Sequence, residues 1–224
     1  MSEMGAMRDL RDGLVLAALP HVPFDGWSPR VLRDAAKSLG VDQTMGERAF
    51  PGGGVAAIEH LADLADRRLT EEAEASDLPS MRLAERIAWL TRRRIEGWAE
   101  HREAVRRAVT LLSLPTNGAT AMRTTWRTVD TIWYAAGDSS ADFSYYTKRA
   151  GLAAVYTATL LYWLEDESEG FADSWEFLHR RLADMSGLPK LREAVERRVG
   201  HLPNPLRFLA EKMPSRRHFG VRRG

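Results

Sequence analysis

Apolar residues recur at steps of three and four along almost the whole chain, and no stretch shows the convincing apolar–polar alternation of a β-strand. Steps of three and four place side chains on one face of a helix. The spacing therefore predicts an all-α protein. The chain has 224 residues, of which 44% are hydrophobic, and it can bury the core of one large domain or of a small domain joined to a larger one.

The N-terminal part predicts a small unit of short helices. Three helices are expected, over 8–20, 28–39 and about 42–50. Ser28 followed by Pro29 is a strong helix start, because serine caps free amides and proline suits the first turn. Gly40 fits the C-terminal cap of that helix. The arrangement is typical of a helix-turn-helix head with its turn at Gly40.

Longer helices follow the head. A connecting helix is expected after the break at 51–54 and runs to about residue 74. Further helices are expected over about 80–97, 100–113, 119–136, 141–165 and 173–186, the last opened by a capping box of Asp173 and Glu176. We divide the chain into a helix-turn-helix-like head (1–60), a larger helical domain (61–186) and an amphipathic basic tail (187–224).

Composition excludes several classes of function. The net charge of +1 provides no overall field toward nucleic acid or membrane, and the absence of cysteine excludes disulfides, thiolate nucleophiles and cysteine-ligated zinc. The apolar run 14–19 is too short for a secretory signal, and the run 150–164 is interrupted by two threonines. We therefore expect a cytoplasmic protein without a targeting segment.

No catalytic, metal or cofactor site is expected. Glu176 and His179 have the spacing of one half of a di-iron ligand set, but the other histidines supply no second pair. The glycine-rich run 51–54 lacks the Gly-Lys-Ser/Thr of a phosphate-binding loop.

The head is expected to be a scaffold rather than a reader of DNA. Its third helix region, 42–48, carries two acids, Asp42 and Glu47, and one base, Arg48. Acids facing the phosphate backbone oppose binding. We expect no nucleic-acid partner, with a working DNA-binding head as the alternative.

The segment 148–164 is apolar on more than one face, which predicts a helix buried nearly all round. One of its stripes consists of small residues, which allow either a ligand tail or a neighbouring helix to approach closely. A bundle with a large apolar interior can hold a hydrophobic ligand. The residues predicted to line such a pocket are Leu83, Ile87, Leu90, Trp126, Val129, Gly151, Leu152, Ala154, Val155, Tyr156 and Ala158.

Aromatic residues crowd the two sides of one short loop, namely Trp133, Tyr134, Phe143, Tyr145 and Tyr146. Because neighbouring positions on a helix point in different directions, some of these rings must face outward. Exposed aromatics mixed with charge favour a protein interface, and a helix-corner cluster is the alternative.

The tail combines apolar residues with a basic edge. Its predicted membrane-contacting residues are Leu206, Phe208, Leu209 and Met213, which lie beside several arginines and Lys212. Such a segment can lie in the plane of an anionic bilayer. A terminal helix docked on the bundle is the alternative.

Several runs resemble the ubiquinone-biosynthesis accessory family, the ninth in the coenzyme Q protein series. The quoted runs are Leu114-Pro-Thr-Asn117, Asp130-Thr-Ile-Trp-Tyr-Ala-Ala-Gly-Asp138, Ser140-Ala-Asp-Phe-Ser-Tyr-Tyr-Thr-Lys-Arg-Ala150, Leu152-Ala-Ala-Val-Tyr156 and Trp175-Glu-Phe-Leu-x-x-Arg181. An N-terminal run, Ala17 to Ser28, also fits. The resemblance covers roughly 10–60 and 104–186.

The resemblance implies a TetR-type regulator fold whose DNA-binding role is lost, forming a homodimer that encloses a lipid pocket and engages membrane through its tail. It implies a non-catalytic role with a polyprenyl quinone precursor or phospholipid as ligand and the ring hydroxylase of the pathway as partner, on the inner face of the membrane. The implied partner-binding residues are Asp130, Ile132, Trp133, Asp142, Tyr145, Tyr146 and Arg149. Tyr145 stands where the family often has tryptophan. The runner-up is a TetR-type ligand-responsive transcription regulator.

Overall fold

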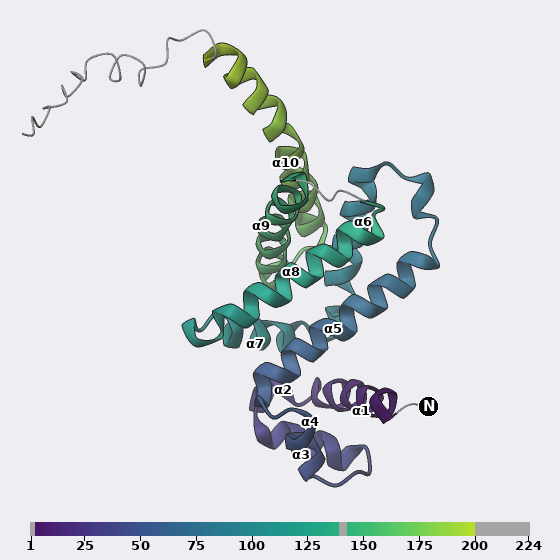
Figure 1. Ribbon diagram of the computed structural model, residues 1–224. Coiled ribbons are helices and arrows are strands. Elements are labelled where there is room, and N and C mark those ends of the chain that lie inside the picture. The colour runs from purple at the N-terminus through teal and green to yellow at the C-terminus, as the bar shows by residue number, and fades with distance from the viewer. Residues whose placement is uncertain (1–2, 139–142, 200–224) are drawn as a thin grey trace, which may run out of the picture. The chain divides into compact units, whose positions relative to one another are not determined.

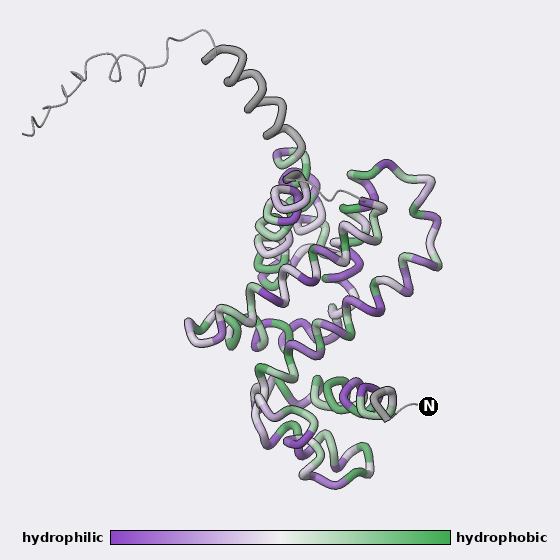
Figure 2. Tube along the Cα trace, viewed as in Figure 1, coloured by the Kyte–Doolittle hydropathy of each residue, from purple (hydrophilic) through white to green (hydrophobic). Residues whose placement is uncertain are grey.

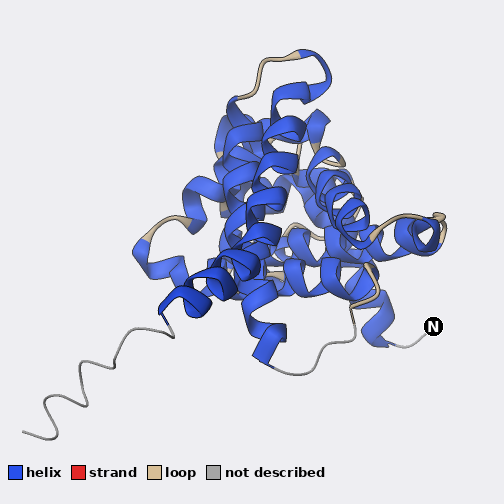
Figure 3. Ribbon diagram, turned by 90° about the horizontal axis from the view of Figure 1, so that it is seen from above, coloured by secondary structure: helices blue, strands red, loops and turns tan. Residues whose placement is uncertain are grey.

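The computed structural model describes the backbone of residues 3–138 and 143–199, and the side chains of 5–138 and 145–185. All regular structure in these ranges is helical (Figure 3), which confirms the all-α prediction. The helices are α1 (Glu3–Ala18), α2 (Val22–Asp25), α3 (Pro29–Ser38), α4 (Thr44–Ala49), α5 (Gly53–Glu74), α6 (Leu83–Glu96), α7 (Arg102–Leu112), α8 (Gly118–Ala135), α9 (Phe143–Glu165) and α10 (Ala172–Val199). Single 3₁₀ turns connect several of them, at 78–80, 99–101, 115–117 and 169–171.

Contacts divide the chain into a compact unit, Met1–Ala183, and a second unit, Asp184–Gly224. The account below concerns the first unit. Helix α5 crosses the predicted head boundary at residue 60, so it contributes to both the head and the bundle. Within the described residues, we find no helix with the combined length and apolar character needed to cross a membrane.

The head is built from α1, α3 and α4, which lie together in Figure 1. The Ser28 hydroxyl accepts a hydrogen bond from the Val31 amide at 3.3 Å, and Pro29 begins α3 as predicted. Gly40 follows α3 with φ of 70°, a left-handed conformation that favours glycine. Leu14, Leu32 and Phe50 are fully buried between these helices. The short helix α2 was not predicted from the sequence.

Helix α5 leaves the head and runs beside α8 (Figure 1). Hydrophobic and hydrophilic residues alternate every few positions along both helices (Figure 2), as in helices with one buried face. The head and the bundle are also joined by the indole of Trp27, which donates a buried hydrogen bond to the Ala104 carbonyl of α7 at 3.1 Å.

The start of α10 differs from the predicted capping box. The Asp166 carboxylate accepts hydrogen bonds from the backbone amides of Ser168, at 2.8 Å, and Ser174, at 2.9 Å, and from both serine hydroxyls. Asp173 is exposed and lies inside the first turn. The capping residue, Asp166, lies seven residues before the predicted Asp173, because the 3₁₀ turn at 169–171 folds Asp166 back over the helix start. The helix also continues to Val199, past the predicted end at 186.

The Asp166 cap predicts a loss of stability in acid. Burial opposes ionisation, but the hydrogen bonds from Ser168 and Ser174 outweigh it and lower the pKa of Asp166 from 3.8 to about 2. The carboxylate therefore stabilises the fold above about pH 4, and this contribution disappears as the pH falls toward 2. Asp166→Asn is expected to lower the free energy of unfolding at pH 6 by about 1 kcal/mol and to flatten its pH dependence. Urea unfolding between pH 6 and pH 2 measures both, with Asp173→Asn as the exposed control; equal pH profiles for the two variants would contradict the cap.

Candidate functional site

The bundle contains a cavity of about 320 Å³ between α5, α6, α7, α8 and α9. It is lined by Ile58, Leu61 and Ala62 of α5; by Arg94 and Ile95 of α6, with Trp98 just after it; by Val105, Ala108, Val109 and Leu112 of α7, with Ser113 just after it; by Ala121, Thr124, Thr125 and Thr128 of α8; and by Tyr156, Thr157, Leu160, Leu161 and Trp163 of α9. Its volume lies at the lower end of the range of about 300 to 1,000 Å³ for small-molecule sites.

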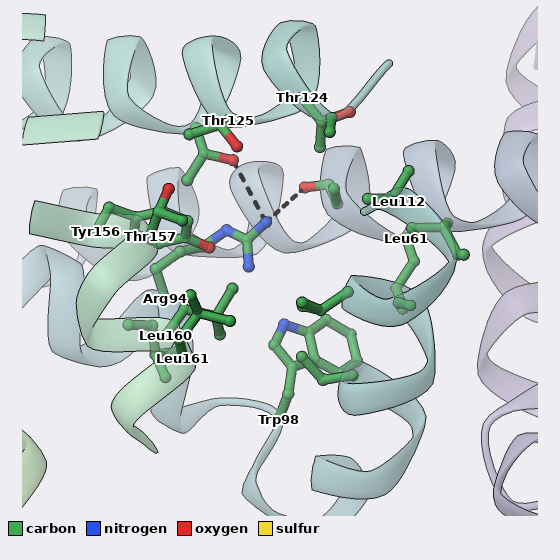
Figure 4. Close-up of a pocket in the computed structure, with 18 of the residues that line it drawn as sticks. Leu61, Arg94, Trp98, Leu112, Thr124, Thr125, Tyr156, Thr157, Leu160 and Leu161 are labelled. Carbon is green, nitrogen blue, oxygen red and sulfur yellow. Dashed lines mark hydrogen bonds between the residues drawn. The ribbon is translucent and has the colours of Figure 1, made fainter. Parts of the chain in front are cut away.

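Most of this lining is apolar, and the cavity reaches the surface beside α9. Leu161 lines the cavity and is 48% exposed, and Thr157 and Ser113 are also both lining and exposed. Deeper in, Trp98 and Leu61 close the side formed by α5 and the end of α6 (Figure 4). The cavity therefore has a largely apolar interior and a mouth beside α9 and the end of α7.

One wall of the cavity carries a buried ion pair. The Arg94 guanidinium donates to the Asp66 carboxylate at 2.7 Å and to the Ala62 carbonyl at 3.2 Å, and both side chains of the pair are less than a tenth exposed. The Thr128 hydroxyl donates to Asp66 at 2.9 Å, and the Arg127 guanidinium donates to Asp66 at 3.2 Å from the other side. Figure 4 shows the Arg94 side chain reaching into the site from α6. Asp66 thus holds Arg94 in a fixed position at the cavity wall.

Three further polar groups lie on the same cavity. The Thr124 hydroxyl and the Trp163 indole nitrogen are buried and have no hydrogen-bond partner among the described residues. The Tyr156 hydroxyl forms no hydrogen bond within that part of the chain either, and burial raises its pKa while the nearby Arg94 charge opposes the rise. Tyr156 is therefore a neutral hydrogen-bonding group at neutral pH.

The structure brings only one of the predicted pocket residues, Tyr156, to this cavity. Leu83 is 44% exposed at the start of α6, so its assignment to a pocket is wrong. The remaining predicted residues pack between helices or face outward. Ile87, Leu90, Val129, Leu152 and Val155 are buried away from the cavity, Trp126, Gly151 and Ala158 are half-buried, and Ala154 is exposed. Periodicity identifies buried positions. A buried helix packs against neighbours on several sides, however, and only one side of it faces the cavity.

Sequence reasoning missed the contributions of α5 and α7 and the Arg94 side chain. A signal was present in the sequence, since Thr124, Thr125 and Thr128 interrupt an amphipathic helix with small polar residues on one side. An arginine within the apolar positions of α6 is a second such signal, because a buried arginine requires a partner.

The predicted partner-binding residues form a contact cluster at the junction of α8 and α9. The Arg149 guanidinium donates to the Asp130 carboxylate at 2.5 Å and lies 3.4 Å from the centre of the Tyr145 ring. The Tyr145 hydroxyl donates to Asp130 at 3.0 Å, which raises its pKa. Tyr146 is 63% exposed and stacks on Trp126 with 6.4 Å between ring centres. The charged cluster therefore holds an exposed aromatic surface in place.

Two of the predicted partner-binding residues cannot contact a partner directly. Ile132 is fully buried and Trp133 is 4% exposed, with its indole donating to the Lys148 carbonyl at 3.3 Å. Ile132 is covered because it lies on the side of α8 opposite Asp130, and Trp133 is covered because α9 packs against it at Lys148. Asp142 lies outside the described residues, as do the predicted membrane-contacting residues Leu206, Phe208, Leu209 and Met213. Among the described residues there is no group of three or more acidic or histidine side chains able to hold a metal.

Known proteins are similar to this chain in sequence and in fold. The profile of the COQ9 family matches residues 118–189. The Ubiquinone biosynthesis protein COQ9, mitochondrial, of Drosophila melanogaster is 31% identical over 191 residues, covering 84% of this chain and 58% of that protein. Its counterpart in Homo sapiens is 34% identical over 189 residues, covering 78% and 57%. A solved structure of a TetR transcriptional regulator from Nitrosomonas europaea covers 80% of this chain and 98% of its own, with a TM-score of 0.65 and 24% identity.

These comparisons correct the expected location. The sequence predicted a cytoplasmic protein, whereas the relatives in Drosophila melanogaster, Homo sapiens and Bos taurus are all named as mitochondrial proteins, which points to a mitochondrial location instead. A chain without cysteine forms no disulfides, but that property does not distinguish one reducing compartment from another.

The likeness to the TetR regulator concerns the fold alone, and it confirms the predicted TetR-like architecture. The chain spans somewhat more than half of the length of the curated relatives that it matches. The family profile covers α8, α9 and the first part of α10, which carry the Thr124–Trp163 side of the cavity and the aromatic surface at Tyr146. By this profile and these relatives, the chain is similar to the COQ9 family over most of its length.

Proposed function

We propose that this protein is a non-catalytic, lipid-binding accessory protein of ubiquinone biosynthesis that presents a polyprenyl quinone precursor to the ring hydroxylase. The relatives named as ubiquinone biosynthesis proteins support the pathway. The observation that carries lipid binding is the cavity of about 320 Å³ with its largely apolar lining and its mouth at Leu161. Each methylene exposed to water costs about 0.8 kcal/mol, and an apolar lining removes this cost for the part of a prenyl chain that it covers outside the bilayer.

Filling the cavity provides the direct test of lipid binding. Ala121 lines the cavity from α8, and Ala121→Trp is expected to reduce bound lipid at least about tenfold, because the larger ring occupies the ligand volume. Ala119 lies on the same helix and is exposed, so Ala119→Trp is the matched control with unchanged lipid content. Native mass spectrometry of the two purified variants measures the lipid that each retains. Equal lipid content in the two variants would contradict binding in this cavity.

The aromatic surface of α8 and α9 is the proposed docking site for the hydroxylase. Tyr146 is exposed, and Trp126 lies half-buried against it. The hydrogen bonds of Tyr145 and Arg149 to Asp130 fix the position of this surface where α8 and α9 meet. Exposed aromatic side chains often account for much of the energy of protein interfaces. The homodimer that the family resemblance implies is also part of the proposal.

Removal of this surface has a defined expected outcome. Tyr146→Ala is expected to weaken hydroxylase binding about tenfold or more without changing the fold, because the ring contacts few interior atoms. Phe24 of the head is 84% exposed, and Phe24→Ala is the control that removes an exposed ring elsewhere. Surface plasmon resonance with immobilised hydroxylase measures both variants. Affinity that falls equally for the two would show that the Tyr146 surface has no special role.

A TetR-type transcription regulator is the second candidate, because the fold is shared with a regulator. The exposed side chains of the region that would enter the groove include Asp42, Glu47 and Arg48, and Glu47 forms an ion pair with Arg33. This pairing removes one base from contact with phosphate, which disfavours DNA binding. Sequence-specific binding in a gel shift at physiological salt would support the regulator instead.

A further inference from the structure

The polar groups on the cavity are mostly hydrogen-bond donors. The Trp163 indole and the Arg94 guanidinium can only donate, and the hydroxyls of Thr124 and Tyr156 can donate as well as accept. The Thr124 and Trp163 groups are buried without partners in the described chain. A buried donor without a partner destabilises the fold, so a ligand that brings oxygen acceptors to this wall relieves that cost.

Charge on the wall is already balanced. Arg94 lies 2.7 Å from Asp66, and the neighbouring Arg127 is shared between Asp66, at 3.2 Å, and Asp63, at 3.7 Å. An anionic head group would have to be buried among apolar side chains without an unpaired cation to meet it, which is unfavourable. The wall therefore suits neutral acceptors such as carbonyl, methoxy or hydroxyl oxygens.

The positions of the polar wall and of the mouth determine the direction of binding. The exposed lining residue Leu161 and half-buried Leu160 lie toward the surface, whereas Trp163, Thr124 and Arg94 are less than a tenth exposed. A cavity of about 320 Å³ holds one ring with a short chain and cannot hold a long polyprenyl chain as well.

We propose that the cavity binds its ligand head first: an oxygen-bearing neutral ring, such as a quinone, contacts the wall of Arg94, Thr124, Tyr156 and Trp163, and the prenyl chain leaves through the mouth at Leu161. This inference rests on the proposed function and adds which end of the lipid the cavity recognises. It implies that the ring is shielded from water inside the cavity, whose polar wall shares α8 and α9 with the aromatic surface around Tyr146.

The test compares two ligands of matched chain length with the full-length protein. One is a ubiquinone with two isoprene units, and the other is the corresponding isoprenoid hydrocarbon without a ring. Trp163→Phe and Thr124→Val are each expected to weaken quinone binding about five- to tenfold and to leave hydrocarbon binding within about twofold. Isothermal titration calorimetry measures the affinities, and circular dichroism checks the fold.

Thr91 offers a matched control. Its hydroxyl is fully buried and lacks a partner in the described chain, as the Thr124 hydroxyl does, but Thr91 does not line the cavity. Thr91→Val is therefore expected to leave both affinities unchanged. An effect of Thr91→Val equal to that of Thr124→Val would overturn the polar wall as a ligand contact.

The outcomes separate this inference from the proposed function. Quinone and hydrocarbon that bind wild-type protein equally, and that are weakened equally by the variants, would overturn head-first binding and leave lipid binding standing. A fatty acid that binds more tightly than the quinone, and whose binding depends on the same two side chains, would overturn the inference that the cavity prefers a neutral head group. No binding of any of the three ligands would overturn both proposals.

Discussion

Asp66→Asn is expected to lower the free energy of unfolding by about 3 to 5 kcal/mol. Asp66 and Arg94 are both buried, and their side chains lie 2.7 Å apart with Thr128 and the Ala62 carbonyl completing the network. Removing the carboxylate charge leaves the Arg94 guanidinium in an apolar interior with only neutral partners. The destabilisation comes from this uncompensated charge rather than from the net contribution of the ion pair itself.

Two further variants test that reason. Asp63 lies one turn earlier on α5, and its side chain is 38% exposed in contacts with Arg67 and Arg127, so Asp63→Asn is expected to cost less than about 1 kcal/mol. The double variant Asp66→Leu with Arg94→Met removes both charges together and is expected to recover most of the lost stability. Urea unfolding measures all three proteins. If the double variant were as unstable as Asp66→Asn, the loss of stability would come from altered side-chain packing and not from the unpaired charge of Arg94.

Gly54→Ala is expected to lower the free energy of unfolding by about 3 kcal/mol. A Cβ atom at Gly54 would overlap the carbonyl oxygen of Trp27 and lie 2.8 Å from the Trp27 Cβ. Backbone atoms cannot rotate away as the end of a flexible side chain can. The segment carrying Trp27 must therefore move, and this movement also displaces the indole from the Ala104 carbonyl that joins the head to α7.

Gly118 provides the control for the glycine prediction. It begins α8 with φ of −56°, and a Cβ there would meet nothing within 4 Å. Gly118→Ala is expected to leave the stability unchanged or to raise it by about 0.4 to 1 kcal/mol, because alanine restricts the unfolded chain. Thermal unfolding followed by circular dichroism distinguishes the two variants. Equal stability of Gly54→Ala and wild type would show that the head tolerates the displacement.

The aromatic surface around Tyr146 shows how far a local sequence motif can predict which residues are exposed. The sequence run around Tyr145 and Tyr146 indicated aromatic residues mixed with charge, some of them facing outward, and the structure brings Tyr145 against Tyr146 and Arg149 against Asp130. The run did not distinguish Tyr146, which is exposed, from Trp133, which is buried. Exposure depends on where α9 crosses α8, and neither helix contains that information in its own spacing.

The sequence by itself determined the longer helices, the cap at Ser28 and the turn at Gly40, because helix periodicity and capping depend on residues within a few positions of each other. The TetR-like architecture was indicated by the family resemblance and not by these local patterns. Only the tertiary structure decided that Leu83 is exposed, that Tyr156 alone of the predicted set lines the cavity, and that Asp66 holds Arg94 at its wall. Asp66 and Arg94 are 28 residues apart, and their contact exists only once α5 and α6 pack together. A cavity is the space that several helices leave between them, so its lining follows from their packing rather than from the pattern of any one helix.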